Sequence, residues 1–125
     1  MKSVVRRLIL VVEDDEAILR SVEQILADEG YAVAVALNGR EALEQVRRAT
    51  PHLILLDMKM PVMDGWAFAA AYQQLPGPHA PIVTLTAARD SRARAAEIAA
   101  ADSIAKPFDL DKLLDLVRRY VFPHG

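Results

Sequence analysis

The feature that most constrains this chain is the alternation of short apolar runs with segments of helical periodicity. Residues 8–12 and 53–56 are continuous apolar runs of strand length, and residues 82–86 form a similar run that includes two threonines. Between these runs apolar residues recur at helical spacing, as at Ile18, Val22 and Ile25. Strands that are apolar on both faces indicate a parallel sheet covered by helices on both sides.

The pattern predicts five strands alternating with five helices. We expect strands at residues 8–12, 31–36, 53–57, 82–86 and 104–105, and helices at 17–26, 42–46, 66–74, 89–99 and 110–117. Asn38-Gly39 is expected to form a turn, and Gly30 to end the first helix. With right-handed crossovers, the leading topology is the doubly wound, flavodoxin-like fold with strand order 2-1-3-4-5. We expect one domain over residues 1–125, with its core at about 8–121 and no output domain.

Composition narrows the classes of function. The net charge is −2, so the chain lacks the basic surplus of a nucleic-acid-binding domain, and we expect no direct contact with nucleic acid. Cysteine is absent, which excludes disulfides, thiolate metal sites and thiol nucleophiles. The apolar run 8–12 is too short for a membrane span or a signal peptide, so it is interpreted as a strand. We expect a cytoplasmic protein that does not associate with membranes.

Polar side chains stand at the ends of four predicted strands. They are Glu13 and Asp14 after the first strand, Asp57 at the end of the third, Thr86 at the end of the fourth and Lys106 after the fifth. Any one of them alone would usually be the start of a solvated loop. Because the carboxyl ends of parallel strands meet at one edge of the sheet, their convergence predicts a ligand site there.

The residue types at this edge suggest phosphoryl chemistry. Three carboxylates packed together raise one another's pKa unless a cation lies between them. Oxygen ligands without Cys or His favour a hard ion, and Mg²⁺ suits a site that leaves room for water and phosphate. Such an ion would keep Asp57 ionised as a nucleophile toward a phosphoryl group. Lys106 and the Thr86 hydroxyl would then hold phosphoryl oxygens.

Five segments together resemble the receiver domains of bacterial two-component response regulators. The resemblance covers residues from about 8 to 121. It rests on Ile9-Leu10-Val11-Val12-Glu13-Asp14-Asp15, Leu55-Leu56-Asp57-Met58, Met60-Pro61-Val62-Met63-Asp64-Gly65, Leu85-Thr86-Ala87 and Lys106-Pro107-Phe108. Each motif alone is modest evidence, but five in order are highly specific.

The resemblance implies roles for the site residues. Asp57 would accept a phosphoryl group from a phosphohistidine on a sensor histidine kinase or a histidine phosphotransfer protein. Asp14, Asp57 and the backbone carbonyl of Lys59 would bind Mg²⁺ directly, and Glu13 would act through water. Lys106 would pair with the phosphoryl group, and the peptide bond between Lys106 and Pro107 would be cis. Thr86 would move toward the phosphate and report its presence.

The resemblance also implies an output surface. The face formed by the fourth helix, the fifth strand and the fifth helix would change its preferred protein partner, and it could form a homodimer. Without an output domain, the chain would act by binding a downstream target protein or by relaying phosphate. We expect no enzyme activity beyond slow self-catalysed phosphorylation and dephosphorylation.

Three positions depart from the family pattern or leave alternatives open. Ser103 stands where the family usually has an aromatic residue that rotates inward as the threonine moves. Serine here is either a neutral replacement or a sign that threonine-to-aromatic coupling is absent, and we favour the second because serine cannot fill the pocket that the threonine vacates. Ala100 stands where the family commonly has glycine. Alanine would cost ~1 kcal/mol if the backbone there needs positive φ, but we expect instead that the local turn differs. Lys59 either faces solvent and contributes only its carbonyl, or shields the acyl phosphate from water with its ammonium group.

Two further features concern the third and fourth helices. Arg89, Arg92 and Arg94 are expected to give the fourth helix a basic surface, either solvated or used for partner docking. Trp66 follows Gly65 near the site and could serve as a fluorescence reporter.

Two functions other than a phosphorylation switch are considered for a chain with these residues. A receiver-like docking module that acts without phosphorylation is the alternative, and only Ser103 favours it. An aspartyl phosphatase would need a second acid two residues after Asp57, where Lys59 stands. No Gly-x-Gly-x-x-Gly turn follows the first strand, so a dinucleotide cofactor is not expected.

Overall fold

The computed structural model describes residues 6–87 and 91–122, and its elements alternate as the sequence predicts. They are β1 (Leu8–Val12), α1 (Glu16–Asp28), β2 (Ala32–Ala36), α2 (Gly39–Arg48), β3 (Leu53–Asp57), α3 (Gly65–Gln74), β4 (Ile82–Ala87), α4 (Ser91–Glu97), β5 (Asp102–Lys106) and α5 (Leu110–Val121). The strands form one parallel sheet in the order β2-β1-β3-β4-β5. The predicted doubly wound topology is confirmed.

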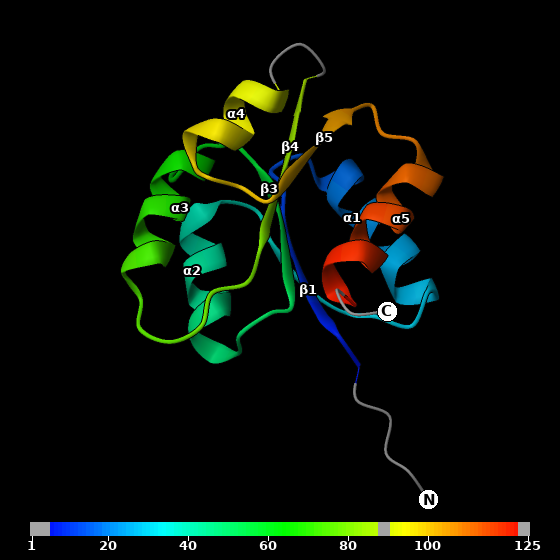
Figure 1. The fold of residues 1–125 in the computed structure, drawn as a ribbon, viewed down its shortest axis with the longest axis horizontal. Coiled ribbons are helices and arrows are strands. Elements are labelled where there is room, and N and C mark those ends of the chain that lie inside the picture. Colours follow the sequence, from blue (N-terminus) through cyan, green and yellow to red (C-terminus); the bar gives the residue numbers. More distant parts are fainter. Residues whose placement is uncertain (1–5, 88–90, 123–125) are drawn as a thin grey trace, which may run out of the picture.

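The sheet separates two layers of helices, with α2, α3 and α4 on one face and α1 and α5 on the other (Figure 1). Alternate residues of each central strand enter opposite cores. In β3, Ile54 and Leu56 pack toward the α2–α4 layer, while Leu53 and Leu55 pack toward α1 and α5. All four are fully buried, and each such side chain contributes about 1.5–3 kcal/mol to folding. The two-sided core holds the carboxyl ends of β1 and β3 in place.

Side-chain caps define where several helices begin. Asp15, Asn38, Asp64 and Asp109 accept hydrogen bonds from the first free backbone N–H groups of α1, α2, α3 and α5. The chain bends at Leu37 and Asn38 between β2 and α2, as expected for the Asn38-Gly39 pair, and Asn38 also caps α2, which begins at Gly39. The cap of α1 lies three residues after the end of β1, and the cap of α3 ends the loop that follows β3.

The fourth helix and fifth strand differ from their predicted bounds. β5 extends over Asp102–Lys106 rather than over residues 104–105. Its pairing with β4 runs the full length, from Val83 opposite Asp102 to Ala87 opposite Lys106, so backbone hydrogen bonding carries the strand beyond its apolar centre. α4 spans Ser91–Glu97 rather than 89–99, and Arg89 lies outside the described residues.

Helix α4 ends in a left-handed backbone turn. Ala99 has φ 54°, the N–H of Ala100 donates to the carbonyl of Ala95 at 2.9 Å, and the N–H of Ala99 donates to Ala96 at 3.3 Å. This pair of hydrogen bonds is the Schellman arrangement, in which the left-handed position usually holds glycine. The positive φ therefore falls on Ala99. Ala100, where the family commonly has glycine, does not have a positive φ.

Within the described residues, no helix is both long enough and apolar enough to span a bilayer.

Candidate functional site

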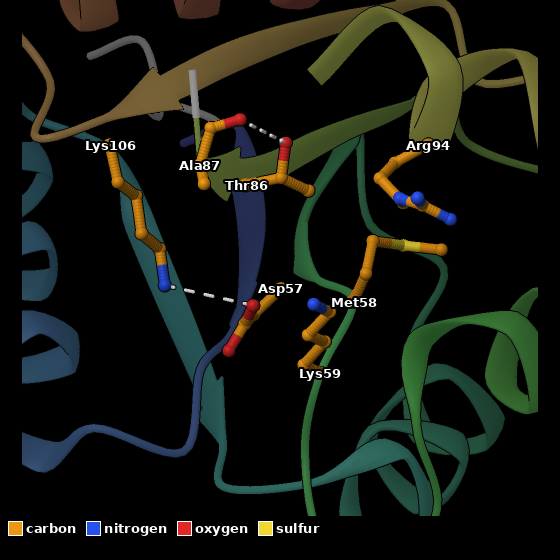
Figure 2. A pocket seen from close by; sticks show the side chains of 7 residues that line it. All are labelled: Asp57, Met58, Lys59, Thr86, Ala87, Arg94 and Lys106. Carbon is orange, nitrogen blue, oxygen red and sulfur yellow. Dashed lines mark hydrogen bonds and ion pairs between the residues drawn. The ribbon is translucent and has the colours of Figure 1, made fainter. Parts of the chain in front are cut away.

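A pocket of about 90 Å³ opens at the carboxyl ends of β3, β4 and β5 (Figure 2). Its lining consists of Asp57, Met58, Lys59, Thr86, Ala87, Arg94 and Lys106. Asp57, Thr86 and Lys106 are the residues that the sequence placed at the ends of three separate strands. The predicted convergence of these strand ends is therefore present.

The acidic residues form one cluster beside the pocket. One carboxylate oxygen from each of Glu13, Asp14 and Asp57 lies within 4.8 Å of the other two. Glu13 and Asp57 are buried, whereas Asp14 is exposed to solvent. The cluster joins the end of β1 to the end of β3, two neighbouring strands in the sheet.

Close backbone packing holds Asp57 at the end of β3. The N–H of Gly65 donates to the carbonyl of Met58 at 2.9 Å, and a Cβ at Gly65 would lie 2.8 Å from the Met58 Cα. Only glycine permits this approach of the loop to the strand end. The Asp-Gly pair of the sequence motif thus serves two purposes, because Asp64 caps α3 while Gly65 packs against the strand.

Lys106 neutralises part of the acidic cluster. Its Nζ lies 2.5 Å from Glu13 Oε1, an ion pair without the angles of a hydrogen bond, and 3.6 Å from Asp57 Oδ1. Burial acts to lower the pKa of Lys106, but the Glu13 carboxylate and the charges of Asp57 and Asp14 outweigh it, so the pKa is raised. Lys106 therefore stays a cation at neutral pH. The Lys106–Pro107 bond is cis, as the resemblance implied.

Crowding of carboxylates perturbs Asp57 strongly. Burial, followed by its hydrogen bond with Glu13 and the Glu13 charge, raises the pKa of Asp57 to about 8, although Lys106 acts to lower it. One lysine thus leaves the cluster under-neutralised. A cluster of hard oxygen ligands with excess negative charge fits a divalent cation, and the residues present are suited to Mg²⁺ in particular.

Two other predicted residues lie at the pocket. Thr86 is buried, and its Oγ1 donates to the carbonyl of Ala87 at 3.3 Å rather than to a carboxylate. Lys59 is exposed at the pocket lining. This position is compatible both with an ammonium group that faces solvent and with one that shields a phosphoryl group on Asp57.

Ser103 shares a face of the sheet with Thr86. In the β4–β5 register Ser103 lies opposite Thr84, and Ala105 lies opposite Thr86. Because side chains alternate along a strand, Ser103 and Thr86 project to the same side, which is also the side of Ile82 and the α2–α4 core. A residue at position 103 is therefore placed to respond to Thr86, but serine has no ring to do so.

Sequence reasoning missed Arg94 as a site residue. It was assigned to a basic surface, yet its side chain is only 28% exposed and lines the pocket. The Arg94 guanidinium lies over the Trp66 ring, with its carbon 5.4 Å from the ring centroid. The sequence carries no local signal for this contact, since it depends on how α4 packs beside α3. The side chains of Arg89 and Arg92 lie outside the described residues.

Comparison with known proteins agrees with this geometry. The transcriptional regulatory protein PcoR of Escherichia coli is 36% identical over 112 residues, which are 88% of this chain and 49% of PcoR. The chain therefore spans about half the length of that relative. The chemotaxis response regulator CheY4 of Vibrio cholerae superposes with a TM-score of 0.84 at 32% identity, covering 93% of this chain and 99% of CheY4.

A third relative bears on the acidic cluster. The receiver domain of the sensor histidine kinase PA1611 from Pseudomonas aeruginosa was solved with a magnesium ion coordinated in its active site cleft. It superposes with a TM-score of 0.83 at 30% identity, covering 94% of this chain and 98% of that domain. The family model described as the response regulator receiver domain matches residues 9–118. On this match, the fold and the site, the chain belongs to the response regulator receiver domain family.

Proposed function

We propose that the chain is a phosphorylation switch in which Asp57 is the phosphoacceptor. The observation that carries the proposal is the arrangement of a buried carboxylate at a strand end, beside a lysine and two further carboxylates, in a pocket open to solvent. Phosphoryl transfer needs mainly positioning and charge neutralisation, and these residues supply both.

The proposed step is an exchange of bonds at phosphorus. An Asp57 carboxylate oxygen attacks the phosphoryl group of a phosphohistidine; the O–P bond forms as the P–N bond breaks, and the imidazole nitrogen keeps the electron pair. Lys106, already 3.6 Å from Asp57, would pair with a phosphoryl oxygen. Thr86 would exchange its weak hydrogen bond to Ala87 for one to the phosphoryl group. Hydrolysis of the acyl phosphate would be slow and self-catalysed.

We also propose a Mg²⁺ site in the acidic cluster. By resemblance to the family, Asp14, Asp57 and the Lys59 carbonyl would bind the ion directly and Glu13 would act through water. The cluster of three carboxylates, with its excess negative charge, supports a divalent cation at this place. When bound, Mg²⁺ supplies the positive charge that lets carboxylates and phosphoryl oxygens lie close together.

The partners follow from the same proposal. The phosphoryl donor would be a sensor histidine kinase or a histidine phosphotransfer protein in the cytoplasm. The α4–β5–α5 face would bind a downstream protein or form a homodimer when Asp57 is phosphorylated.

The test is a titration with beryllofluoride, a mimic of the phosphoryl group, followed by amide chemical shifts in NMR. Wild type and Asp57→Asn are compared with and without Mg²⁺. We expect Mg²⁺-dependent shift changes around Asp57, Thr86 and Lys106 in wild type and none in the variant. The absence of changes in wild type at saturating Mg²⁺ would favour the alternative of a docking module that works without phosphorylation.

The two proposed roles of Lys59, shielding by its ammonium group or Mg²⁺ binding by its carbonyl alone, predict different lifetimes of the acyl phosphate. If its ammonium shields the phosphoryl group, Lys59→Ala will hydrolyse several-fold faster than wild type, as measured by loss of phosphoprotein after removal of acetyl phosphate. An unchanged decay rate would restrict Lys59 to its backbone carbonyl. Lys112→Ala, an exposed lysine on α5, is the matched control.

A further inference from the structure

Arg94 lies at two places at once, in the lining of the pocket beside Asp57 and in the contact between α3 and α4. The residue is one of seven that line the pocket, together with Asp57, Thr86 and Lys106. In the view of Figure 2 it comes from α4, and its guanidinium turns away from Asp57 beyond the Met58 side chain. There Nη1 donates to Glu97 Oε1 at 2.5 Å.

The same guanidinium is held by α3. It lies over the ring of Trp66, with its carbon 5.4 Å from the centroid, and the Trp66 Nε1 donates to Glu97 Oε2 at 2.7 Å. Arg94, Glu97 and Trp66 therefore form one polar and aromatic cluster between the two helices. We call it the α3–α4 clasp.

The clasp leaves Arg94 incompletely satisfied. Its Nε is buried and has no hydrogen-bond partner. A buried donor without an acceptor is unfavourable, so this arrangement leaves room for a better one. The ion pair with Glu97 is partly exposed on both sides, and pairs of this kind contribute little to stability. The guanidinium can therefore leave Glu97 at small cost.

A phosphoryl group on Asp57 would offer what the clasp lacks. It adds a charge of about −1.5 to −2 and three strong acceptor oxygens to the pocket that Arg94 lines. A guanidinium binds such oxygens in a planar, two-pronged geometry that a lysine cannot reproduce. Lys106 already pairs with Glu13 and Asp57, and Lys59 lines the pocket on its exposed side. Arg94 is thus a further cation that can respond to phosphorylation.

We propose that Arg94 binds the phosphoryl group on Asp57 and, in doing so, opens the α3–α4 clasp. The inference rests on the proposed phosphoacceptor function and adds a route from the site to α4. This route requires no aromatic residue at position 103, where the chain has serine. The displaced Trp66 and the released Glu97 would change the surface that α3 and α4 present to a partner.

The test uses the fluorescence of Trp66, the only tryptophan in the chain. Beryllofluoride is titrated with saturating Mg²⁺ into wild type, Arg94→Gln and Glu97→Gln, and binding is followed in parallel by the amide shifts of residues 57 and 86. In wild type we expect Trp66 emission to change along with binding. Arg94→Gln should bind about tenfold more weakly and lose most of the emission change.

Glu97→Gln is expected to raise the affinity for beryllofluoride. It removes the anion that competes for the guanidinium, so beryllofluoride should bind a few-fold more tightly than to wild type. A purely structural role for the clasp does not predict opposite effects of these two substitutions. Arg94→Lys, which keeps the charge without the fork, should fall between wild type and Arg94→Gln. Arg119→Gln is the matched control, because Arg119 is 67% exposed on α5 and pairs with Asp102 away from the pocket.

The outcomes separate the two proposals. If Arg94→Gln binds beryllofluoride with wild-type affinity and gives the wild-type emission change, the role of Arg94 is overturned while the acceptor function of Asp57 stands. If wild type itself shows no Mg²⁺-dependent binding at the amides of residues 57 and 86, the phosphoacceptor proposal fails and the role of Arg94 fails with it. Circular dichroism of each variant checks that the fold is retained.

Discussion

The burial of Asp57, the proposed phosphoacceptor, lowers the stability of the fold at neutral and higher pH. Its carboxylate is buried beside Glu13 and Asp14, and the resulting pKa of about 8 means that the free site resists ionisation. Because this value lies above the ordinary 3.8, the folded state holds an extra proton between about pH 4 and pH 8. Stability therefore falls as the pH rises through that window. A bound cation would remove this cost.

The first prediction at the residue scale is that Asp57→Asn stabilises the cation-free protein. At pH 8.5 we expect a gain of about 2 kcal/mol in the free energy of unfolding, less than the pKa alone implies because water in the pocket screens the charge. The gain should shrink at pH 5 and at saturating Mg²⁺. Urea denaturation measures it, and a gain independent of pH would show that charge crowding is not its source.

The backbone conformation of Val62 also lowers the stability of the folded protein. Its φ is 70°, the N–H of Met63 donates to the carbonyl of Pro61 across it at 2.8 Å, and its side chain is 76% exposed. A β-branched residue in a γ-turn with positive φ is strained, and this one gains no burial in return. The strain lies in the loop between Asp57 and α3.

We expect Val62→Gly to stabilise the protein by about 1 kcal/mol, because the relief of strain exceeds the greater freedom of glycine in the unfolded chain. Thermal unfolding measures the gain. Val62→Ala is the control, since it shortens the side chain but keeps the Cβ and should give a smaller gain. Equal gains from both substitutions would mean that the backbone conformation is not the cause.

At the scale of elements, α4 is the helix whose end is least well matched to its sequence. Its Schellman turn places Ala99 at φ 54°, where glycine is favoured, while Ala100 continues the chain without positive φ. Ala100, where the family commonly has glycine, therefore needs no positive φ, in agreement with the expectation that the local turn differs. The left-handed position is set by where the helix hydrogen bonds stop.

Ala99→Gly should therefore stabilise the protein by ~1 kcal/mol, whereas Ala100→Gly should be neutral or destabilising by less than that amount. Chemical denaturation of the two variants provides the comparison. If Ala100→Gly proves to be the stabilising one, the turn adopts a different backbone in solution.

At the scale of the whole molecule, the proposed switch requires a physical route from Asp57 to the α4–β5–α5 face, the proposed partner surface. The two-sided core holds the sheet in place, so a change at Asp57 must travel through side chains that cross to the helices. Ser103 and Thr86 project to the same side of β5 and β4, toward the layer that contains α4. Serine is too small to fill space vacated by Thr86. The α3–α4 clasp offers another route.

Ser103→Tyr is expected to strengthen the phosphorylation-dependent conformational change by restoring an aromatic residue that can follow Thr86. The measure is the extent of amide shift changes across α4, β5 and α5 on addition of beryllofluoride and Mg²⁺. Equal changes in the serine and tyrosine forms would show that the aromatic position plays no part in this chain.

The sequence by itself determined the fold and most of the candidate site. Apolar periodicity and the turn residues between runs are local patterns, and they predicted the strand order and the meeting of Asp57, Thr86 and Lys106 at one edge. The predicted bounds of a strand were too short where backbone pairing, and not hydrophobic side chains, extends the strand, as in β5. Only the tertiary structure decided the pKa of Asp57, the positive φ of Ala99 and the position of Arg94 against Trp66. The first and the third depend on contacts between segments far apart in the chain, which no local pattern encodes. The positive φ of Ala99 depends on the residue at which the hydrogen bonds of α4 stop, and a run of alanines carries no glycine to mark that residue.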